Sequence, residues 1–354
     1  PVPAPPVLTP PLTPGAPPST TPPFATPPIA FLSTAQSTSQ ASPAGYVGDY
    51  IITFRSGATP ADRAAVVQRA GALLRFNYRI VNAVAVRVPN VNVLAALQRD
   101  MSVMEIIPDR PVYAIQGPAA PPAGTGKPGG GGTTGQVVPQ GVNRVGKPTS
   151  SSNGSGIGVA ILDTGIDFNH KDLAPAPAGQ WFSAFGTSCQ DDNGHGTHVT
   201  GTVAALDNTI NVVGVAPLAK PYCVKVLDSS GTGSDSTLIA GLDWVGTQGT
   251  ATPPIRVVNM SLGRGGTLND NTALRAAMQA LYSLGIVVVA AAGNDPYKEV
   301  SQMVPATYPE VLAIASTTAL DGSNACKFFS GLIKADTASY FTTDGKFDTA
   351  TRIG

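Results

Sequence analysis

The sequence is short of charge and of long apolar runs. Only 12% of its 354 residues are charged, and 22 basic residues balance 22 acidic ones, so the formal net charge is zero. Proteins that bind nucleic acid or an anionic membrane surface carry a basic patch, and this balance gives no sign of one. The longest apolar run, residues 286–292, is far too short to span a bilayer and predicts a buried strand instead.

Cysteine and histidine are also scarce. The three cysteines, Cys189, Cys223 and Cys326, would leave one thiol over if two of them paired in an oxidising compartment, and their spacing fits no metal knuckle. Two of the three histidines, His195 and His198, stand three residues apart in a run of small residues. These two imidazoles are therefore the first place to look for chemistry.

Proline and glycine, in contrast, are abundant, with 33 and 39 residues. Fourteen of the prolines fall within residues 1–47, mixed with Ser, Thr and Ala. Such a segment buries too little apolar surface to offset its ordering entropy, so we predict that it is extended and disordered. It begins at Pro1 without a charged and then apolar leader, so any secretion signal is expected to have been removed or left out.

A small α+β domain is predicted over residues 48–115. Its expected order is a strand (49–54), a helix (59–74), a strand (79–89), a helix (91–100) and an extended stretch (103–115). Thr59 is expected to cap the first helix, with Pro60 at its first position. Residues 116–135 follow as a Pro/Gly linker that should be flexible and accessible to proteases.

From residue 136 onward, short apolar runs alternate with helical stretches at 233–247 and 270–284. The apolar runs are 158–165, 220–228, 256–263, 285–294 and 311–317. Continuous apolar strands between helices are typical of a parallel sheet that is covered on both faces. In such sheets the chemistry lies at the carboxyl ends of the strands, where this sequence has Asp-Thr-Gly, Ser-Leu-Gly and Gly-Asn.

Asp163 and His195 are the candidates for acid–base chemistry. Asp163 ends a predicted strand, and His195 and His198 begin a predicted helix between close glycines. An acid that orients an imidazole, and an imidazole that takes a proton, are two members of a nucleophile–base–acid triad. Two other interpretations remain: Asp163 could cap a turn, and the two histidines could bind zinc, although no obvious third ligand accompanies them.

Three stretches resemble the motifs of the subtilisin-like serine proteases (subtilases, peptidase family S8), and they come in the family's order. They are ILDTGID (161–167), NGHGTHVTGT (193–202) and AAAGN (290–294). The resemblance implies that Asp163 is the orienting acid, His195 the general base with His198 packed beneath it, and Asn294 the oxyanion donor. It also implies a parallel-sheet, three-layer α/β peptidase domain over 136–354, incomplete at its C-terminus, after a ferredoxin-like α+β prodomain over 48–115.

The resemblance further implies a substrate cleft. Residues 261–263 would pair with an extended substrate backbone, as in strand addition, and residues 231–234 would form the opposite wall. Residues 290–293 would line a broad, apolar pocket for the residue before the cut bond. The implied substrate-binding residues are Gly231, Gly233, Ser261, Leu262, Gly263, Ala291 and Gly293.

Residues 206–217 resemble the calcium loop of this family. The implied ligands are Gln136, Asp172, Leu206, Asn208, Ile210 and Val212. Oxygen ligands from an irregular loop suit a hard cation such as Ca²⁺, and the alternative is an exposed turn without a metal. Gln136 also matches the family's mature N-terminus, so the maturation cut is expected just before it. Until then residues 111–115 of the prodomain would lie in the cleft.

The nucleophile of the triad is missing from the sequence. Subtilases carry it in a Gly-Thr-Ser-x-Ala motif after the oxyanion Asn, and residues 295–354 contain no such motif. The only Gly-Thr-Ser, residues 186–188, precedes His195 and is interpreted as a decoy. We therefore expect that the chain is a fragment that stops before the catalytic Ser and is itself inactive.

Two functions follow as hypotheses. The first is a secreted serine endopeptidase made as a zymogen, a calcium-binding monomer that acts on polypeptides, is inhibited by its own prodomain, and uses neither nucleic acid nor a membrane span. The second is a catalytically inactive, truncated pseudoprotease that binds peptides or acts through its prodomain. A coding sequence that continues past Gly354 into Gly-Thr-Ser-x-Ala would favour the first.

Overall fold

A computed structural model describes residues 48–116, 135–146, 151–177, 179–249, 251–318, 335–339 and 342–343. These residues belong to one compact unit. The predicted disordered segment 1–47, residues 117–134 of the linker, and Cys326 lie outside the described residues.

The described chain begins with a four-stranded antiparallel sheet and two helices. The elements are β1 (Gly48–Phe54), α1 (Pro60–Ala70), β2 (Leu73–Asn77), β3 (Ala83–Val88), α2 (Val91–Arg99) and β4 (Val103–Pro108). The strand order β2-β3-β1-β4 and the βαββαβ sequence of elements are those of ferredoxin-like folds. Thr59 caps α1 in a reciprocal capping box with Asp62, as its position predicts.

The sequence prediction missed one strand of this sheet. The helix expected over 59–74 ends at Ala70, because Gly71 adopts a left-handed φ of 83° and stops it. Leu73–Asn77 then forms β2, paired with β3. Helix propensity and apolar spacing continue past Gly71 in the sequence, so only the glycine indicated this boundary.

A six-stranded parallel sheet forms the centre of the remaining residues. Its order is β14-β12-β10-β6-β8-β7, and its strands are β6 (Gly158–Asp163), β7 (Phe182–Ser183), β8 (Lys220–Lys225), β10 (Ile255–Met260), β12 (Val287–Ala291) and β14 (Val311–Ile314). All neighbouring pairs are parallel. Five of the strands coincide with the five apolar runs of the sequence.

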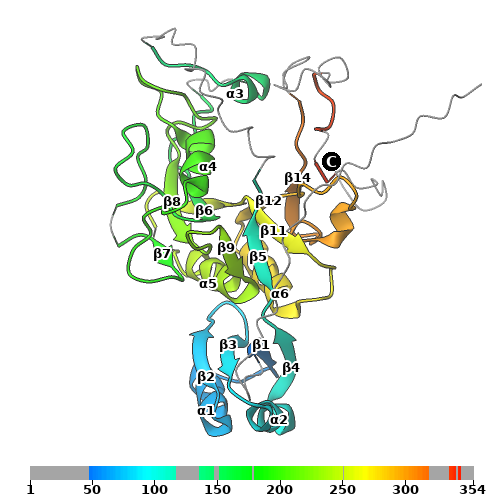
Figure 1. Ribbon diagram of the computed structural model, residues 1–354. Helices are drawn as coiled ribbons and strands as arrows, with labels where there is room; N and C mark the ends of the chain where they lie inside the picture. The colour runs from blue at the N-terminus through cyan, green and yellow to red at the C-terminus, as the bar shows by residue number, and fades with distance from the viewer. Residues whose placement is uncertain are drawn as a thin grey trace, which may run out of the picture. The chain divides into compact units, whose positions relative to one another are not determined.

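Helices lie on both faces of this sheet (Figure 1). Helix α4 (His195–Ala204) packs on one face, whereas α5 (Asp235–Gly246) and α6 (Thr272–Ser283) pack on the other. This arrangement confirms the predicted three-layer α/β domain. Two short helices, α3 (Gln140–Arg144) and the 3₁₀ turn Val300–Gln302, complete the helices of the described residues. None of the described helices has the length and apolar character that a bilayer span requires.

The α4 side of the sheet is only partly covered by described residues. Val257 packs against the α4 cluster, and the strand register places Val287, Leu312 and Ile314 on the same side. Their side chains are 46%, 53% and 54% exposed. Parallel sheets in α/β proteins have both faces covered, so this part of the face lacks its covering layer within the described chain.

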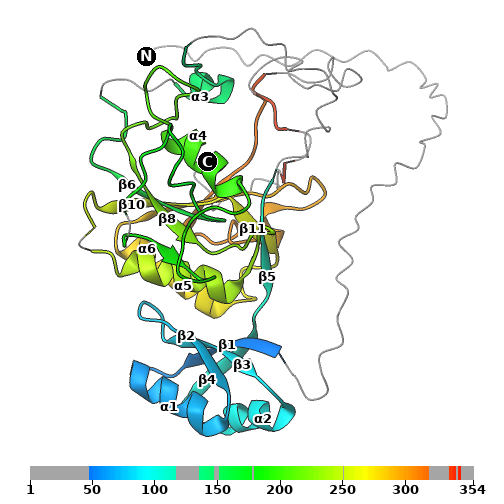
Figure 2. The same cartoon turned by 60° about the vertical axis from the view of Figure 1, so that its left-hand side comes forward.

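A second, small sheet crosses the edge of the domain. Its order is β13-β11-β5-β9, with β5 at Pro111–Ala114, β9 at Thr232–Ser234, β11 at Leu262–Gly265 and β13 at Met303–Val304. Strand β5 is antiparallel to both β9 and β11 and lies between them (Figure 1). Figure 2 shows β5 beside β11. Strand β5, which follows the four-stranded antiparallel sheet in the sequence, therefore pairs on both sides with strands from the part of the chain that forms the parallel sheet.

Candidate active site

Asp163 and His195 meet at the carboxyl end of β6. Asp163 is the last residue of β6 and is fully buried, and His195 is the first residue of α4. His195 Nδ1 lies 2.8 Å from Asp163 Oδ1, which also accepts a hydrogen bond from Thr164 N at 2.7 Å. Because Nδ1 is engaged by the carboxylate, the Nε2 atom is the one that faces the cleft, 3.4 Å from Ile115 O.

The pairing with Asp163 tunes the basicity of His195. Burial by itself lowers the pKa of the imidazole, because it disfavours the charged form. The hydrogen bond to Asp163 and the attraction of its charge act in the opposite direction. Together with smaller contributions from Ile115 O and Asp191 they outweigh burial, so the pKa of His195 is raised above its ordinary value. An imidazole with a raised pKa is a stronger base toward a hydroxyl proton.

Asp191 holds the turn that leads into α4. Its Oδ1 accepts hydrogen bonds from Asn193 N and Gly194 N, both at 3.0 Å, and from the hydroxyl of Thr164 at 2.8 Å. Its Oδ2 accepts from Thr197 N at 2.9 Å. Burial raises the pKa of Asp191, but these hydrogen bonds outweigh it and lower the pKa. Asp191 thus stays ionised and fixes His195 from the loop side, a role that its place in the sequence does not reveal.

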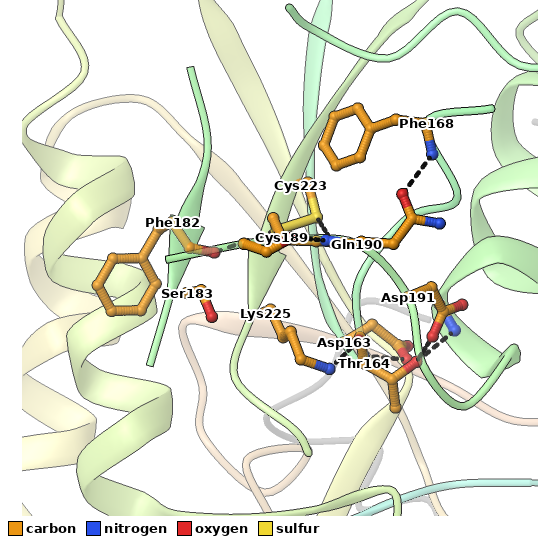
Figure 3. The surroundings of a disulfide bond; sticks show 12 residues. Asp163, Thr164, Phe168, Phe182, Ser183, Cys189, Gln190, Asp191, Cys223 and Lys225 are labelled. Carbon is orange, nitrogen blue, oxygen red and sulfur yellow. Dashed lines mark hydrogen bonds between the residues drawn. A yellow bond between two sulfur atoms is a disulfide. The ribbon is translucent and has the colours of Figure 1, made fainter. Parts of the chain in front are cut away.

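A disulfide and a buried lysine join the same loop to β8 (Figure 3). Cys189 pairs with Cys223, and the described residues thus contain the one disulfide that the composition allowed. Lys225 lies two residues further along β8, donates to Thr164 O and pairs with Asp192 Oδ1 at 2.7 Å. The segment before His195 is therefore held to the sheet at two points, one covalent and one ionic.

The helix carrying His195 approaches the end of β6 so closely that only glycine fits at position 196. A Cβ on Gly196 would lie 2.2 Å from Gly165 O. Gly196 N also donates to the hydroxyl of Thr164 at 2.9 Å. His198 is exposed, one turn further along, and lines the same cavity as His195 instead of packing beneath it.

Asn294 lies across the cleft from His195. It follows β12 at the carboxyl end of the sheet, and its Nδ2 donates a hydrogen bond to Gln116 O. A side-chain amide aimed at a backbone carbonyl is the arrangement that stabilises the oxyanion of acyl transfer. The structure therefore brings Asp163, His195 and Asn294 to one cleft, at the strand ends where the sequence placed them.

The predicted substrate-binding residues flank the segment that occupies this cleft. Leu262 and Gly263 pair with Ala114 and Tyr113, while Gly233 pairs with Val112. Gly231 O accepts from Ala114 N at 2.9 Å, and Ser261 O accepts from Ile115 N at 2.8 Å. Ala291 and Gly293 line a neighbouring cavity of about 400 Å³ together with Ile115 and Asn294.

A larger cavity, of about 600 Å³, opens beside His195. Its walls come from α4, from the turn before α4, from the end of β10 and from the residues that follow β5. The lining residues are Ile115, Gln116, Asn193, His195, His198, Val199, Thr202, Val203, Asn259 and Ser261. Among the described residues, His195 Nε2 hydrogen-bonds to Ile115 O alone. The decoy Ser188 lies in the loop before Cys189, where its hydroxyl accepts from Gln190 N at 3.1 Å, and no helix starts there.

The predicted metal ligands gather around the side chain of Gln136. Gln136 Nε2 lies 2.5 Å from Leu206 O, 3.1 Å from Val212 O and 3.4 Å from Asn208 Oδ1. Asn208 Nδ2 in turn donates to Asp172 Oδ1 at 2.7 Å. Ile210 enters the cluster through its N–H, which donates to Asn208 Oδ1 at 2.8 Å. No three His, Cys, Asp or Glu side chains within the described ranges form a group that could hold a metal ion.

Comparison with known proteins agrees with this geometry. The model of the subtilase family matches residues 154–350. Subtilisin NAT from Bacillus subtilis subsp. natto is 34% identical over 80% of this chain and 68% of its own length. An alkaline protease from Shouchella clausii is 44% identical over 52% of this chain and 46% of its own, so the chain spans about half the length of that relative.

A solved structure shows the same fold. Fervidolysin from Fervidobacterium pennivorans, described as a keratinolytic enzyme related to subtilisin, aligns with a TM-score of 0.59 and 22% identity over 77% of this chain and 44% of its own. The family match covers more than half of the present sequence, and subtilisin NAT is matched over two thirds of its length. The chain therefore belongs to the subtilase family.

Proposed function

We propose that the protein is a serine endopeptidase that is made as a zymogen. The observation that carries this proposal is the cleft itself: His195 Nε2, oriented through Asp163, and the Asn294 amide both meet the backbone of an extended segment bound as a strand. A serine hydroxyl placed there would attack a carbonyl carbon while His195 takes its proton. Asn294 would then hold the negative oxygen, and His195 would pass the proton to the leaving nitrogen.

We place the serine in a part of the protein that follows Gly354, within a Gly-Thr-Ser-x-Ala motif. Two features of the described residues support this. The cavity beside His195 is large enough for a further packed segment and is lined by Val199 and Val203 of α4. The uncovered face around Leu312 and Ile314 needs an apolar layer. A helix that started with the serine could cover both.

The zymogen proposal rests on contacts of residues 48–115, the proposed prodomain, with the peptidase part. Asp109 accepts from Ser236 N at 2.8 Å and from its hydroxyl at 2.6 Å, and Glu105 accepts from the Thr272 hydroxyl at 2.5 Å. These carboxylates sit at the N-termini of α5 and α6, where the helix dipoles favour negative charge. Strand β5 meanwhile fills the cleft that a substrate would need, so bound residues 48–115 would inhibit.

Secretion and a monomeric state belong to the same proposal. The Cys189–Cys223 disulfide suits an oxidising compartment, and secretion would supply one. Polypeptides are the substrates that a strand-pairing cleft selects, because it binds main chain on both sides of an extended segment.

Labelling with a serine-directed fluorophosphonate tests the proposal. The complete protein should incorporate one equivalent at a serine after Gly354, and the 354-residue chain should incorporate none between residues 136 and 354. Labelling of Ser188 would contradict the decoy interpretation. A complete protein that binds peptides in the cleft but neither reacts nor hydrolyses casein would establish the pseudoprotease alternative.

We also propose that the Gln136 cluster binds calcium. Its polar groups supply amide and carbonyl oxygens and one buried carboxylate, Asp172, which is the donor set that a hard cation takes. The Gln136 amide, which now presents its nitrogen to the carbonyls of Leu206 and Val212, would present its oxygen to the ion. Calcium would then tie the loop 206–212 to residues 136–137.

Calcium is expected to raise the unfolding temperature. At 100 times its dissociation constant an ion that binds only the folded state adds about 2.7 kcal/mol, which corresponds to about 5–10 °C for a domain of this size. Asp172→Asn should abolish most of this shift, because it removes the only carboxylate of the cluster. Asp207→Asn removes the same charge from an exposed neighbour and should retain it. Equal unfolding temperatures in calcium and in EDTA would contradict the site.

A further inference from the structure

The segment in the cleft continues beyond β5 to Ile115 and Gln116, and these two residues reach the candidate catalytic groups. Ile115 O lies 3.4 Å from His195 Nε2. Gln116 O accepts a hydrogen bond from Asn294 Nδ2. The chain therefore passes between the general base and the oxyanion donor at residues 115 and 116. Asn294 holds the carbonyl of Gln116 and His195 approaches that of Ile115, so these two contacts do not by themselves choose between the bonds after Ile115 and after Gln116.

The hydrogen-bond register favours the bond after Ile115. Backbone bonds hold the segment on both sides up to Ile115: Ala114 N donates to Gly231 O at 2.9 Å and Ile115 N donates to Ser261 O at 2.8 Å. Val112 is fully buried between β9 and β11, whereas the Tyr113 side chain is 49% exposed. Backbone hydrogen bonds to both walls of the cleft thus hold the strand up to Ile115, and the peptide bond after this residue is the first one beyond them.

Side-chain chemistry distinguishes Ile115 from Gln116. Ile115 lines the 400 Å³ cavity with Ala290, Ala291 and Gly293, and Gln116 is not among its walls. A Cβ on Gly263 would lie 3.2 Å from Ile115 Cδ1, so the glycine leaves room for the isoleucine. Burial of an aliphatic side chain in an apolar pocket contributes about 25 cal/mol of favourable free energy per Å² removed from water. A glutamine amide in the same pocket would lose its hydrogen bonds to water.

We infer that the first maturation cut of this protein falls between Ile115 and Gln116. The inference rests on the proposed function, which supplies the serine. The serine oxygen bonds to the Ile115 carbonyl carbon as its proton passes to His195 Nε2. The Ile115 oxygen, now negative, takes over the hydrogen bond of the Asn294 amide that Gln116 O accepts in the uncut structure. The bond to the Gln116 nitrogen then breaks and takes up that proton. Water hydrolyses the ester, which leaves a carboxylate on Ile115 and an amino group on Gln116.

The contacts of Gln136 separate this cut from the one expected just before Gln136. Val137 pairs with Val212, and Val137 N donates to Asn211 O at 2.8 Å. The bond before Gln136 is therefore held at the loop 206–212 and not in the cleft. The cleft holds Ile115 in the same uncut structure. Cleavage after Ile115 leaves residues 116–135 as an amino-terminal arm, and any cut before Gln136 is a second event that occurs after the first.

Mass spectrometry of the maturing protein tests the inference. The complete protein is allowed to mature in water enriched in ¹⁸O, so that the new carboxyl group carries the label. The released amino-terminal fragment should carry the label on Ile115, and it should form before any chain that begins at Gln136. A fragment labelled on Gln116 or Gly135 would overturn the inference. So would a cut after Ile115 that persists in His195→Ala, because another protease would then be responsible.

Two variants sharpen the test. Ile115→Asp places a charge in the apolar pocket and should slow release at least about tenfold, since even a single methylene changes specificity by about 10–200-fold. Met101→Asp makes the same change at a side chain that is 87% exposed and should leave the rate within about twofold, as expected of a surface substitution. Equal rates for the two variants would overturn the inference.

Casein hydrolysis separates this inference from the proposed function. A protein that hydrolyses casein but releases a fragment ending elsewhere overturns the inference alone. A protein that neither hydrolyses casein nor releases a fragment overturns the proposed function, and the inference with it.

Discussion

His195→Ala is expected to abolish peptide-bond hydrolysis by the complete protein. The alanine removes the imidazole whose Nδ1 lies 2.8 Å from Asp163 Oδ1, and with it the Nε2 atom that faces the cleft. A serine hydroxyl without a base is a poor nucleophile. In subtilisin itself, a member of the same family, loss of this histidine costs about a millionfold in turnover, and we carry that magnitude over to this protein. Casein and peptide hydrolysis, measured at several pH values, check the expectation.

The control for this variant is His170→Ala. His170 is exposed and lines neither of the two cavities of the cleft. Its replacement should change turnover by no more than about twofold, the effect of about 0.5 kcal/mol at a surface position. Both variants should keep the unfolding temperature of the parent within a few degrees. If His195→Ala retained more than a thousandth of the parent rate, another group would have to act as the base.

The sequence predicts the sheet of the peptidase part well, for a physical reason. Strands buried on both faces read as unbroken apolar runs, and all five such runs became neighbouring parallel strands. The carboxyl ends of parallel strands meet at one edge, so Asp163 and Asn294 could be placed together without knowledge of any contact. His195 joined them because glycines on either side allow the start of α4 to approach β6.

The groups that position His195 were not predictable from their spacing. Asp191 accepts from backbone N–H groups and hydroxyls that become neighbours only when the loop closes on Thr164. Lys225 did carry a signal, since a charge within an otherwise apolar strand requires a partner of opposite charge, but the sequence does not say that Asp192 supplies it. The boundary between Ala70 and Leu73 was missed because a single glycine outweighs several helix-forming neighbours.

Asp163→Asn is expected to lower turnover about ten-thousandfold, the size found for the same change in a serine protease with this triad. The asparagine is nearly isosteric, so the ring of His195 can keep its place. With its nitrogen at the Oδ1 position, the amide would donate to Nδ1 and lose the bond from Thr164 N, and the proton would be forced onto Nε2, where the base must be free. It also cannot stabilise the imidazolium that forms when the serine proton is taken.

The same substitution should move the acidic limb of the pH–activity profile. Burial lowers the pKa of His195, and contributions led by the hydrogen bond and the charge of Asp163 more than offset it. In the Asp163→Asn variant the lowering by burial remains and the largest raising contributions are lost, so the imidazole becomes neutral at a lower pH. The limb of kcat/KM should therefore shift toward acid while the plateau falls. An unshifted limb, or one that moves toward alkaline pH, would contradict this account of the pair.

A double-mutant cycle distinguishes an orienting acid from a merely structural one. In the His195→Ala background, Asp163→Asn should cost almost nothing further, because the carboxylate acts through the imidazole and residues of one catalytic unit are strongly non-additive. If Asp163 instead supported the end of β6 independently of His195, the two losses would multiply. The residual rates of the single and double variants, compared at equal folded fraction, decide between these outcomes.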